Sequence, residues 1–174
     1  AGNNAVNRMI AEGLKNVEFI ALNTDAQALS GTAAQTKFII GKEVTRGLGC
    51  GADPALGERS AEEDAEKIKG LLKGADMVFV TAGMGGGTGT GAAPVIAAMA
   101  KKKGILTVGV VTIPFKSEGN ESMSKAIDGI NELEKNVDSL IIINNEKIYK
   151  EYGDLLIQDA FPKADEVLAT AVRG

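Results

Sequence analysis

The sequence predicts a Rossmann-like, doubly wound α/β fold, in which helices cover both faces of a parallel sheet. Three observations lead to this prediction. The strand-like segments are near-continuous apolar runs, as expected where both faces of a sheet are buried. They alternate along the chain with amphipathic helical patterns. Finally, the stretch G-M-G-G-G-T-G-T-G at residues 83–91, here called the signature loop, joins one apolar run to a helical pattern.

The first half of the chain begins with a helical pattern at residues 3–12 and an apolar run at 17–22. A brief strand at 37–40 follows, and then a glycine-rich segment at 46–57 that reads as a loop long enough to reach over a ligand. Ser60 and Glu63 have the spacing of a capping box, which predicts a helix start there, with Gly74 just past the helix end.

The second half repeats the alternation of strand and helix. Strands are expected at 77–82, 105–111 and 140–143. Helical patterns lie at 92–100 and around 126–137, and a last helix is expected from Asp159.

Composition excludes several classes of function. The 174 residues suffice for one domain, and 44% hydrophobic with 24% charged residues is typical of globular proteins. A net charge of -4 without a basic cluster argues against nucleic-acid binding, and no apolar run reaches the roughly 20 residues of a membrane span. The absence of histidine excludes a Ser-His-Asp triad and a histidine-ligated metal. A single cysteine, Cys50, fits a reducing compartment.

The signature loop has the chemistry of an anion site. Glycine lets the backbone approach a ligand closely, and the first N–H groups of the following helix lack intrahelical partners. Together with the helix dipole these groups suit a polyphosphate. A flexible surface loop is the plainer alternative, which its position between a buried strand and a helix disfavours.

In a doubly wound sheet, ligands bind outside the carboxyl ends of the strands. The distinctive loops all fall at that edge, at residues 23–25, 46–57, 83–91, 114–119 and 144–145. Their convergence makes a nucleotide-sized site the leading hypothesis.

Two familiar nucleotide motifs fit poorly. A Walker P-loop needs glycine, lysine and a hydroxyl residue in succession, but Gly41 and Lys42 are followed by Glu43. The pattern G-x-G-x-x-A occurs at 87–92 and at 47–52, yet neither copy has the usual layout after a first strand. An oxidoreductase stays an alternative that bound NAD or FAD would reveal.

Seven segments together carry a family resemblance. In order along the chain they are A-G-N-N-A-V (1–6), A-L-N-T-D-A-Q-A-L (21–29), I-G-K-E-V-T-R-G-L-G-C-G-A-D-P-A-L-G (40–57), G-G-G-T-G-T-G (85–91), P-F-K-S-E-G (114–119), N-E-K (145–147) and A-F-P-K-A-D-E-V-L (160–168). The chain thereby resembles the tubulin/FtsZ family, and its FtsZ cell-division GTPases in particular, with an ending more similar to archaeal members.

The resemblance implies that residues 1–174 are a GTP-binding domain that takes GTP or GDP with Mg²⁺. On the phosphate side it implies contacts from the end of a first glycine-rich loop, from the second nucleotide loop, from a loop that senses the γ-phosphate and from the signature loop. These residues are Ala1, Gly2, Asn3, Asn4, Asn23, Asp25, Gly49, Cys50, Gly51, Gly86, Gly87, Thr88, Gly89 and Thr90. For Cys50, a small tolerated side chain is favoured over a reactive thiol.

On the nucleoside side, Pro114 belongs to the implied site and Glu118 would accept hydrogen bonds from the ribose hydroxyls. Asn145 and Asp165 would read the guanine edge, since a carboxylate can accept from N1–H and N2–H. Phe161 would stack on the base, or else belong to the core.

Two departures from the family pattern matter. Ser122 stands where the family commonly has an arginine, so somewhat weaker or salt-altered binding is expected. The family's first strand, central in the sheet, comes just before A-G-N-N, and its long central helix continues beyond Gly174. We therefore expect the printed residues to be part of a longer chain, with no catalytic residue or metal ligand of their own.

The resemblance also implies a cytoplasmic protein that polymerises head to tail, works with other cell-division proteins, and neither inserts in a membrane nor binds nucleic acid. Hydrolysis would need acidic residues supplied across a subunit contact. A nucleotide-binding assembly or regulatory subunit of the same superfamily that never hydrolyses GTP is the alternative.

Overall fold

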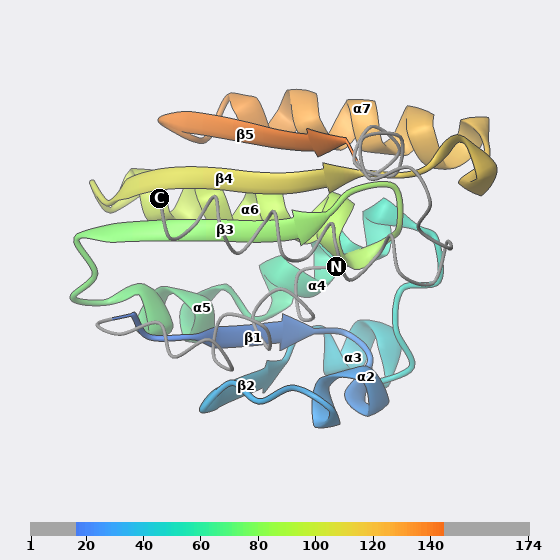
Figure 1. The fold of residues 1–174 in the computed structure, drawn as a ribbon. Coiled ribbons are helices and arrows are strands. Elements are labelled where there is room, and N and C mark those ends of the chain that lie inside the picture. Colours follow the sequence, from blue (N-terminus) through green and yellow to red (C-terminus); the bar gives the residue numbers. More distant parts are fainter. Residues whose placement is uncertain (1–16, 145–174) are drawn as a thin grey trace.

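The computed structural model describes residues 17–144, which form two parallel sheets (Figure 1). Strand β1 (Ile20–Asn23) pairs with β2 (Thr36–Ile39). The second sheet has the order β3-β4-β5, with β3 at Met77–Gly83, β4 at Leu106–Ile113 and β5 at Ser139–Asn144. Every strand pair is parallel. The predicted α/β class with parallel strands is confirmed.

Six α-helices lie between or beside these strands in the described residues. They are α2 (Ala26–Ser30), α3 (Lys42–Thr45), α4 (Pro54–Glu63), α5 (Ala65–Leu72), α6 (Thr88–Lys102) and α7 (Asn120–Glu134), with a 3₁₀ turn, η1, at Lys116–Glu118. Figure 1 shows α6 and α7 behind the second sheet, on the same face. None of these helices combines the length and the apolar character that crossing a membrane requires.

One core cluster joins the two sheets. It includes Ile40 after β2, Ile68 of α5 and Met99 of α6, and both Leu22 of β1 and Val78 of β3 pack against it. The strands β1 and β3 also point the same way in Figure 1. They do not pair with each other, and among residues 17–144 no strand lies between them. That the family's first strand belongs in the middle of the sheet stays a prediction.

A second cluster fixes the helices behind the larger sheet. It contains Val80 of β3, Val111 of β4, Ala97 of α6 and the residues Ala126 and Leu133 of α7. The apolar runs and the helical face predicted from the sequence therefore meet in one core. The structure thus places the start of α6 directly behind the carboxyl end of β3.

The expected loop at 46–57 and the capping box at Ser60 are wrong. Helix α4 already begins at Pro54, because the Asp53 carboxylate accepts from the N–H of Ala55 at 2.9 Å and proline suits the first helical position. Ser60 lies buried inside α4 and donates its hydroxyl to the carbonyl oxygen of Leu56 at 2.6 Å. Gly74 does follow the end of α5, with a positive φ of 83°.

The signature loop is also shorter than predicted. Strand β3 runs through Gly83 and α6 begins at Thr88, so only residues 84–87 form the turn. The helices expected at 3–12 and from Asp159 lie outside the described residues.

Candidate nucleotide site

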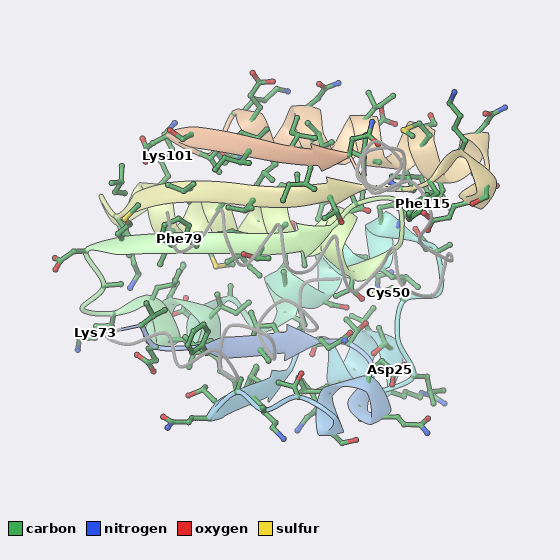
Figure 2. The ribbon with its side chains drawn as sticks, in the orientation of Figure 1. Asp25, Cys50, Lys73, Phe79, Lys101 and Phe115 are labelled. Carbon is green, nitrogen blue, oxygen red and sulfur yellow. The ribbon has the colours of Figure 1, made fainter. Side chains whose placement is uncertain are left out.

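The parallel strands bring the segments that follow them to one edge. Asp25 follows β1, Cys50 lies beyond β2 and Phe115 follows β4, and Figure 2 shows all three at the end to which the strands point. Lys73 and Lys101 lie at the opposite end. The predicted convergence of the loops at the carboxyl edge is therefore confirmed for the described segments.

Five successive backbone N–H groups form the centre of this edge. They belong to Gly86, Gly87, Thr88, Gly89 and Thr90, and none of them has an acceptor among residues 17–144. The helix they open is 15 residues long, so its dipole adds to their positive potential. The N–H of Gly85, in contrast, is already bound to the Thr90 hydroxyl at 2.8 Å. This arrangement suits an anion with several oxygens.

The glycines of the signature loop serve two different purposes. A β-carbon on Gly87 would lie 2.6 Å from the Cys50 β-carbon, and one on Gly89 would lie 2.5 Å from the carbonyl oxygen of Gly83. These two glycines are required by close packing. Gly86 is exposed and a β-carbon there would meet nothing within 4 Å, so it is the open face of the turn.

Asn23 and Asp25 use side-chain oxygens to shape their own turn. The Asn23 Oδ1 atom accepts from the N–H of Thr24 at 2.8 Å, and Asp25 Oδ1 accepts from Gln27 and Ala28 at 2.9 and 3.2 Å. Asp25 is thus the N-cap of α2. Both residues lie at the expected place, while a contact from either to a nucleotide stays a prediction.

Thr24, which the sequence did not single out, is where three loops meet. It is fully buried, and its hydroxyl oxygen lies 2.7 Å from that of Thr88 and accepts from the Cys50 thiol at 3.4 Å. Its carbonyl oxygen accepts from the N–H of Gly49 at 3.1 Å. A threonine between two capping residues gave no pattern that could have revealed this position.

The loop at 49–53 rests on the signature loop and is held from α7. Gly49 and Gly51 adopt positive φ values of 86° and 59°. The Lys125 ammonium group donates to the carbonyl oxygen of Ala52 at 2.5 Å and pairs with Glu121 at 3.1 Å. Ser122, one turn earlier on α7, donates to the carbonyl oxygen of Gly85 at 3.0 Å. Helix α7 therefore contacts both loops.

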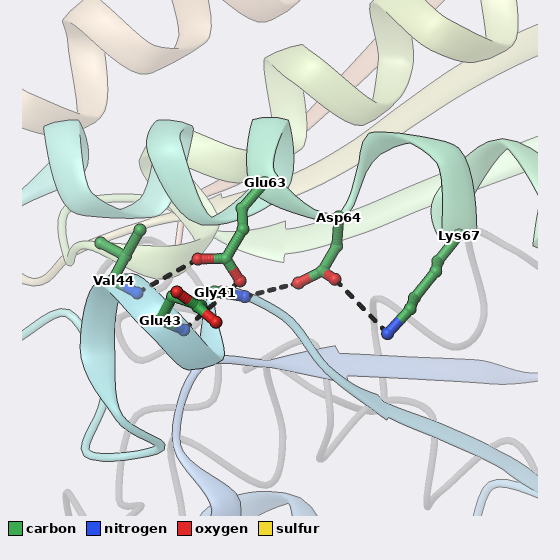
Figure 3. Close-up of polar contacts among 6 residues, drawn as sticks. All are labelled: Gly41, Glu43, Val44, Glu63, Asp64 and Lys67. Atoms are coloured by element: carbon green, nitrogen blue, oxygen red, sulfur yellow. Dashed lines mark hydrogen bonds and ion pairs between the residues drawn. The ribbon is translucent and has the colours of Figure 1, made fainter.

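The entry to that loop is anchored by two carboxylates at the junction of α4 and α5 (Figure 3). Asp64 accepts from the N–H of Gly41 at 2.8 Å, and Glu63 accepts from Glu43 and Val44 at 3.4 and 3.1 Å. Because these N–H groups belong to the start of α3, the carboxylates cap it. Helix α3 then leads directly into the loop at 49–53.

At the far side of the edge, Glu118 is exposed and one carboxylate oxygen accepts from the N–H of Phe115 at 2.5 Å. Pro114 lies beside Gly85, since a β-carbon added to Gly85 would be 3.1 Å from the proline ring. The other implied contacts, at Ala1, Gly2, Asn3, Asn4, Asn145, Phe161 and Asp165, lie outside the described residues. Within residues 17–144 no group of three or more acidic or cysteine side chains could hold a metal.

Comparisons with known proteins identify the family of the chain. Residues 1–153 match the model of the Tubulin/FtsZ family, GTPase domain. An FtsZ dimer from M. jannaschii, solved empty, is 48% identical with a TM-score of 0.96, and the match covers 99% of this chain and 50% of that one.

Two more distant structures come from Haloferax volcanii. A GDP-bound CetZ1 monomer is 26% identical with a TM-score of 0.86, over 97% of this chain and 55% of its own. A CetZ2 protofilament with GTPγS has a TM-score of 0.87 over 98% of this chain and 54% of its own, and at 23% identity it shows the fold alone. The chain thus spans about half the length of these relatives. On this evidence the chain belongs to the tubulin/FtsZ family and corresponds to its GTPase domain.

Proposed function

We propose that this chain is the GTP-binding part of an FtsZ-like cell-division GTPase that assembles head to tail into filaments in the cytoplasm. The observation that carries the proposal is the run of five N–H groups from Gly86 to Thr90, placed where the loops after β1, β2 and β3 meet. Membership of the GTPase family supplies the identity of the ligand.

The phosphates would lie on the exposed side of Gly86, where the turn presents only backbone. Mg²⁺ commonly keeps several waters and is held by substrate phosphates with one or two protein groups. Such a metal would arrive with the nucleotide, and Thr88, whose half-buried hydroxyl lies at the start of α6, would supply a protein oxygen to it. When bound, the metal would neutralise charge on the phosphate oxygens.

The sugar and base would occupy the side toward β4 and β5. Glu118 is exposed at that side. One of its carboxylate oxygens caps η1, and the other would accept from the ribose hydroxyls. By the family resemblance, Asn145 and Asp165 would recognise guanine and Phe161 would stack on it. The discriminating contact would be a carboxylate that accepts from the adjacent N1–H and N2–H groups of guanine, a pair that adenine lacks.

Hydrolysis and assembly would depend on a second subunit. Asp25 and Glu118 are the carboxylates of the implied site that the structure describes, and each already accepts backbone N–H groups as a cap. A base for the attacking water would therefore come from a neighbouring subunit, as the resemblance implies. The solved FtsZ dimer supports self-association of such domains. Other division proteins would bind the filament.

The test is calorimetric titration of the chain with GDP, GTP, ADP and NAD. We expect guanine nucleotides to bind and the other two to bind at least tenfold more weakly. Tight binding of NAD, or equal binding of ADP and GDP, would refute the proposal. Sedimentation with GTP, after fusion to the C-terminal half of a full-length relative, tests assembly.

A non-hydrolysing assembly subunit is the second candidate. It is favoured by the same observation on Asp25 and Glu118, because neither carboxylate is placed as a general base in the described residues. Phosphate release from the fused protein would decide between the two. Filaments that form with GTP but release no phosphate would establish the alternative.

A further inference from the structure

A buried chain of hydrogen bonds runs from Cys50 through Thr24 to Thr88. The Cys50 thiol donates to the Thr24 hydroxyl oxygen at 3.4 Å, and the hydroxyl oxygens of Thr24 and Thr88 lie 2.7 Å apart. Cys50 is 5% exposed and Thr24 is fully buried, so water does not compete for these groups. Thr88 is half-buried and is the first residue of α6.

The direction of these bonds follows from donor counting. Each hydroxyl has one proton to donate and can accept two bonds. The Thr24 oxygen already accepts from the thiol, so its own proton can go to the Thr88 oxygen or back to sulfur. Oxygen at 2.7 Å is much the better acceptor, since a thiol is only a weak one. Donation from Thr24 to Thr88, rather than the reverse, also gives the fully buried Thr24 proton an oxygen acceptor, so we take this direction.

This orientation fixes what Thr88 can do. With its oxygen accepting from Thr24, the Thr88 proton is directed to another acceptor, and no such acceptor occurs among residues 17–144. The hydroxyl stands at the opening of α6, beside the five unpaired N–H groups. It is thus prepared as a sixth donor to the same anion.

We propose that Thr24 is a positioning residue for polyphosphate binding. Thr24 turns the Thr88 hydroxyl into a fixed donor, and the Cys50 thiol sets the direction of the hydrogen-bond chain. The inference rests on the proposed function, because the anion it serves is the phosphate of the nucleotide. It adds a role for Thr24 and for the cysteine, neither of which needs to touch the ligand. Preorganisation of this kind lowers the cost of ordering the donor on binding.

The first experiment is a double-mutant cycle with Thr24→Val and Thr88→Val, read as affinity for GDP and for inorganic pyrophosphate. We expect Thr24→Val to weaken both affinities by about 3- to 10-fold, the range of one neutral hydrogen bond. In the Thr88→Val background the same change should have no further effect, because the donor it orients is gone. Thr24→Ser, which keeps the hydroxyl, should restore the wild-type affinity.

The matched control is Thr107→Val. Thr107 is as fully buried as Thr24 and donates its hydroxyl to the carbonyl oxygen of Ile105 at 2.9 Å, but it lies at the start of β4, away from the site. Thr107→Val should lower the free energy of unfolding much as Thr24→Val does, and leave the affinities for GDP and pyrophosphate unchanged. If the role of Thr24 is purely structural, Thr24→Val should leave the affinities for GDP and pyrophosphate as unchanged as Thr107→Val does.

A second pair of variants covers the case that Thr24→Val does not fold. Cys50→Ser keeps a donor at the first position of the hydrogen-bond chain, and Cys50→Ala removes it. The Cys50→Ser variant should therefore bind pyrophosphate more tightly than the Cys50→Ala variant. Equal affinities for these two, or a Thr24→Val effect that persists unchanged in the Thr88→Val background, would overturn the inference alone. A wild-type chain that binds neither guanine nucleotide nor pyrophosphate would overturn the proposed function and this inference with it.

Discussion

Gly91 of α6 lies so close to Pro54 of α4 that an added β-carbon would overlap the proline's carbonyl oxygen. The obstacle is the backbone of α4, so no side-chain rotation can relieve it. We predict that Gly91→Ala lowers the free energy of unfolding by about 1–3 kcal/mol, the usual cost of overpacking. Urea denaturation followed by circular dichroism measures this change.

Gly70 provides the control for that measurement. It is also an interior helical glycine, in α5, but an added β-carbon would meet nothing within 4 Å. Gly70→Ala should raise the free energy of unfolding by about 0.5–1 kcal/mol, because alanine has the better helix propensity. Equal effects of the two substitutions would contradict the close crossing of α4 and α6.

Gly86→Ala should separate binding from folding. The position is exposed, has no atom within 4 Å of an added β-carbon and does not need a positive φ. The midpoint of unfolding should therefore stay near the wild-type value. Phosphates on the open side of the turn would meet the new methyl group, so we expect affinity for GDP to fall at least tenfold. Unchanged affinity would place the ligand elsewhere.

Lys125→Met should loosen the loop at 49–53 without disturbing α7. The substitution removes the ammonium group that holds the Ala52 carbonyl oxygen at 2.5 Å and keeps an unbranched apolar stem. Bonds from a charged donor contribute about 1.5–3 kcal/mol, so amide exchange in this loop should accelerate tenfold or more. Lys135→Met is the control, since Lys135 pairs only with Glu132 on its own helix among the described residues. Similar exchange in both variants would contradict the anchoring role.

Much of the fold could be read from the sequence because it depends on local patterns. The apolar runs at 77–82 and 105–111 became the paired strands β3 and β4, because near-continuous apolar runs are typical of strands in a parallel sheet. The start of α4 was misplaced because the spacing of Ser60 and Glu63 matched a capping box. Asp53 followed by Pro54 was the stronger signal, and the glycines around it obscured it.

The site could be predicted only in part, because its details depend on distances between segments far apart in the chain. The run of glycines correctly indicated N–H groups after β3 that have no acceptor among residues 17–144. That Gly87 serves packing while Gly86 faces open space follows from the position of Cys50, which no local pattern contains. The same holds for Thr24, whose partner Thr88 is 64 residues away.

Asp64 offers a test of how the loop at 49–53 is anchored. Its carboxylate accepts from the N–H of Gly41, a glycine with a positive φ of 68° that begins α3 (Figure 3). Asp64→Ala would leave this partly buried N–H without its acceptor, at a cost of about 1–3 kcal/mol in the free energy of unfolding. Lys67 lies 3.9 Å from the other oxygen and is largely exposed, so its loss as a partner adds little.

Asp64→Asn separates the hydrogen bond from the charge. Asparagine keeps a carbonyl oxygen for the N–H of Gly41, so it should recover most of the stability lost in Asp64→Ala. Glu62→Ala, on an exposed neighbouring side chain, should change the free energy of unfolding by less than about 0.5 kcal/mol. If the asparagine variant is as unstable as the alanine variant, charge at the start of α3 outweighs the hydrogen bond, because the helix dipole then supplies the larger stabilisation.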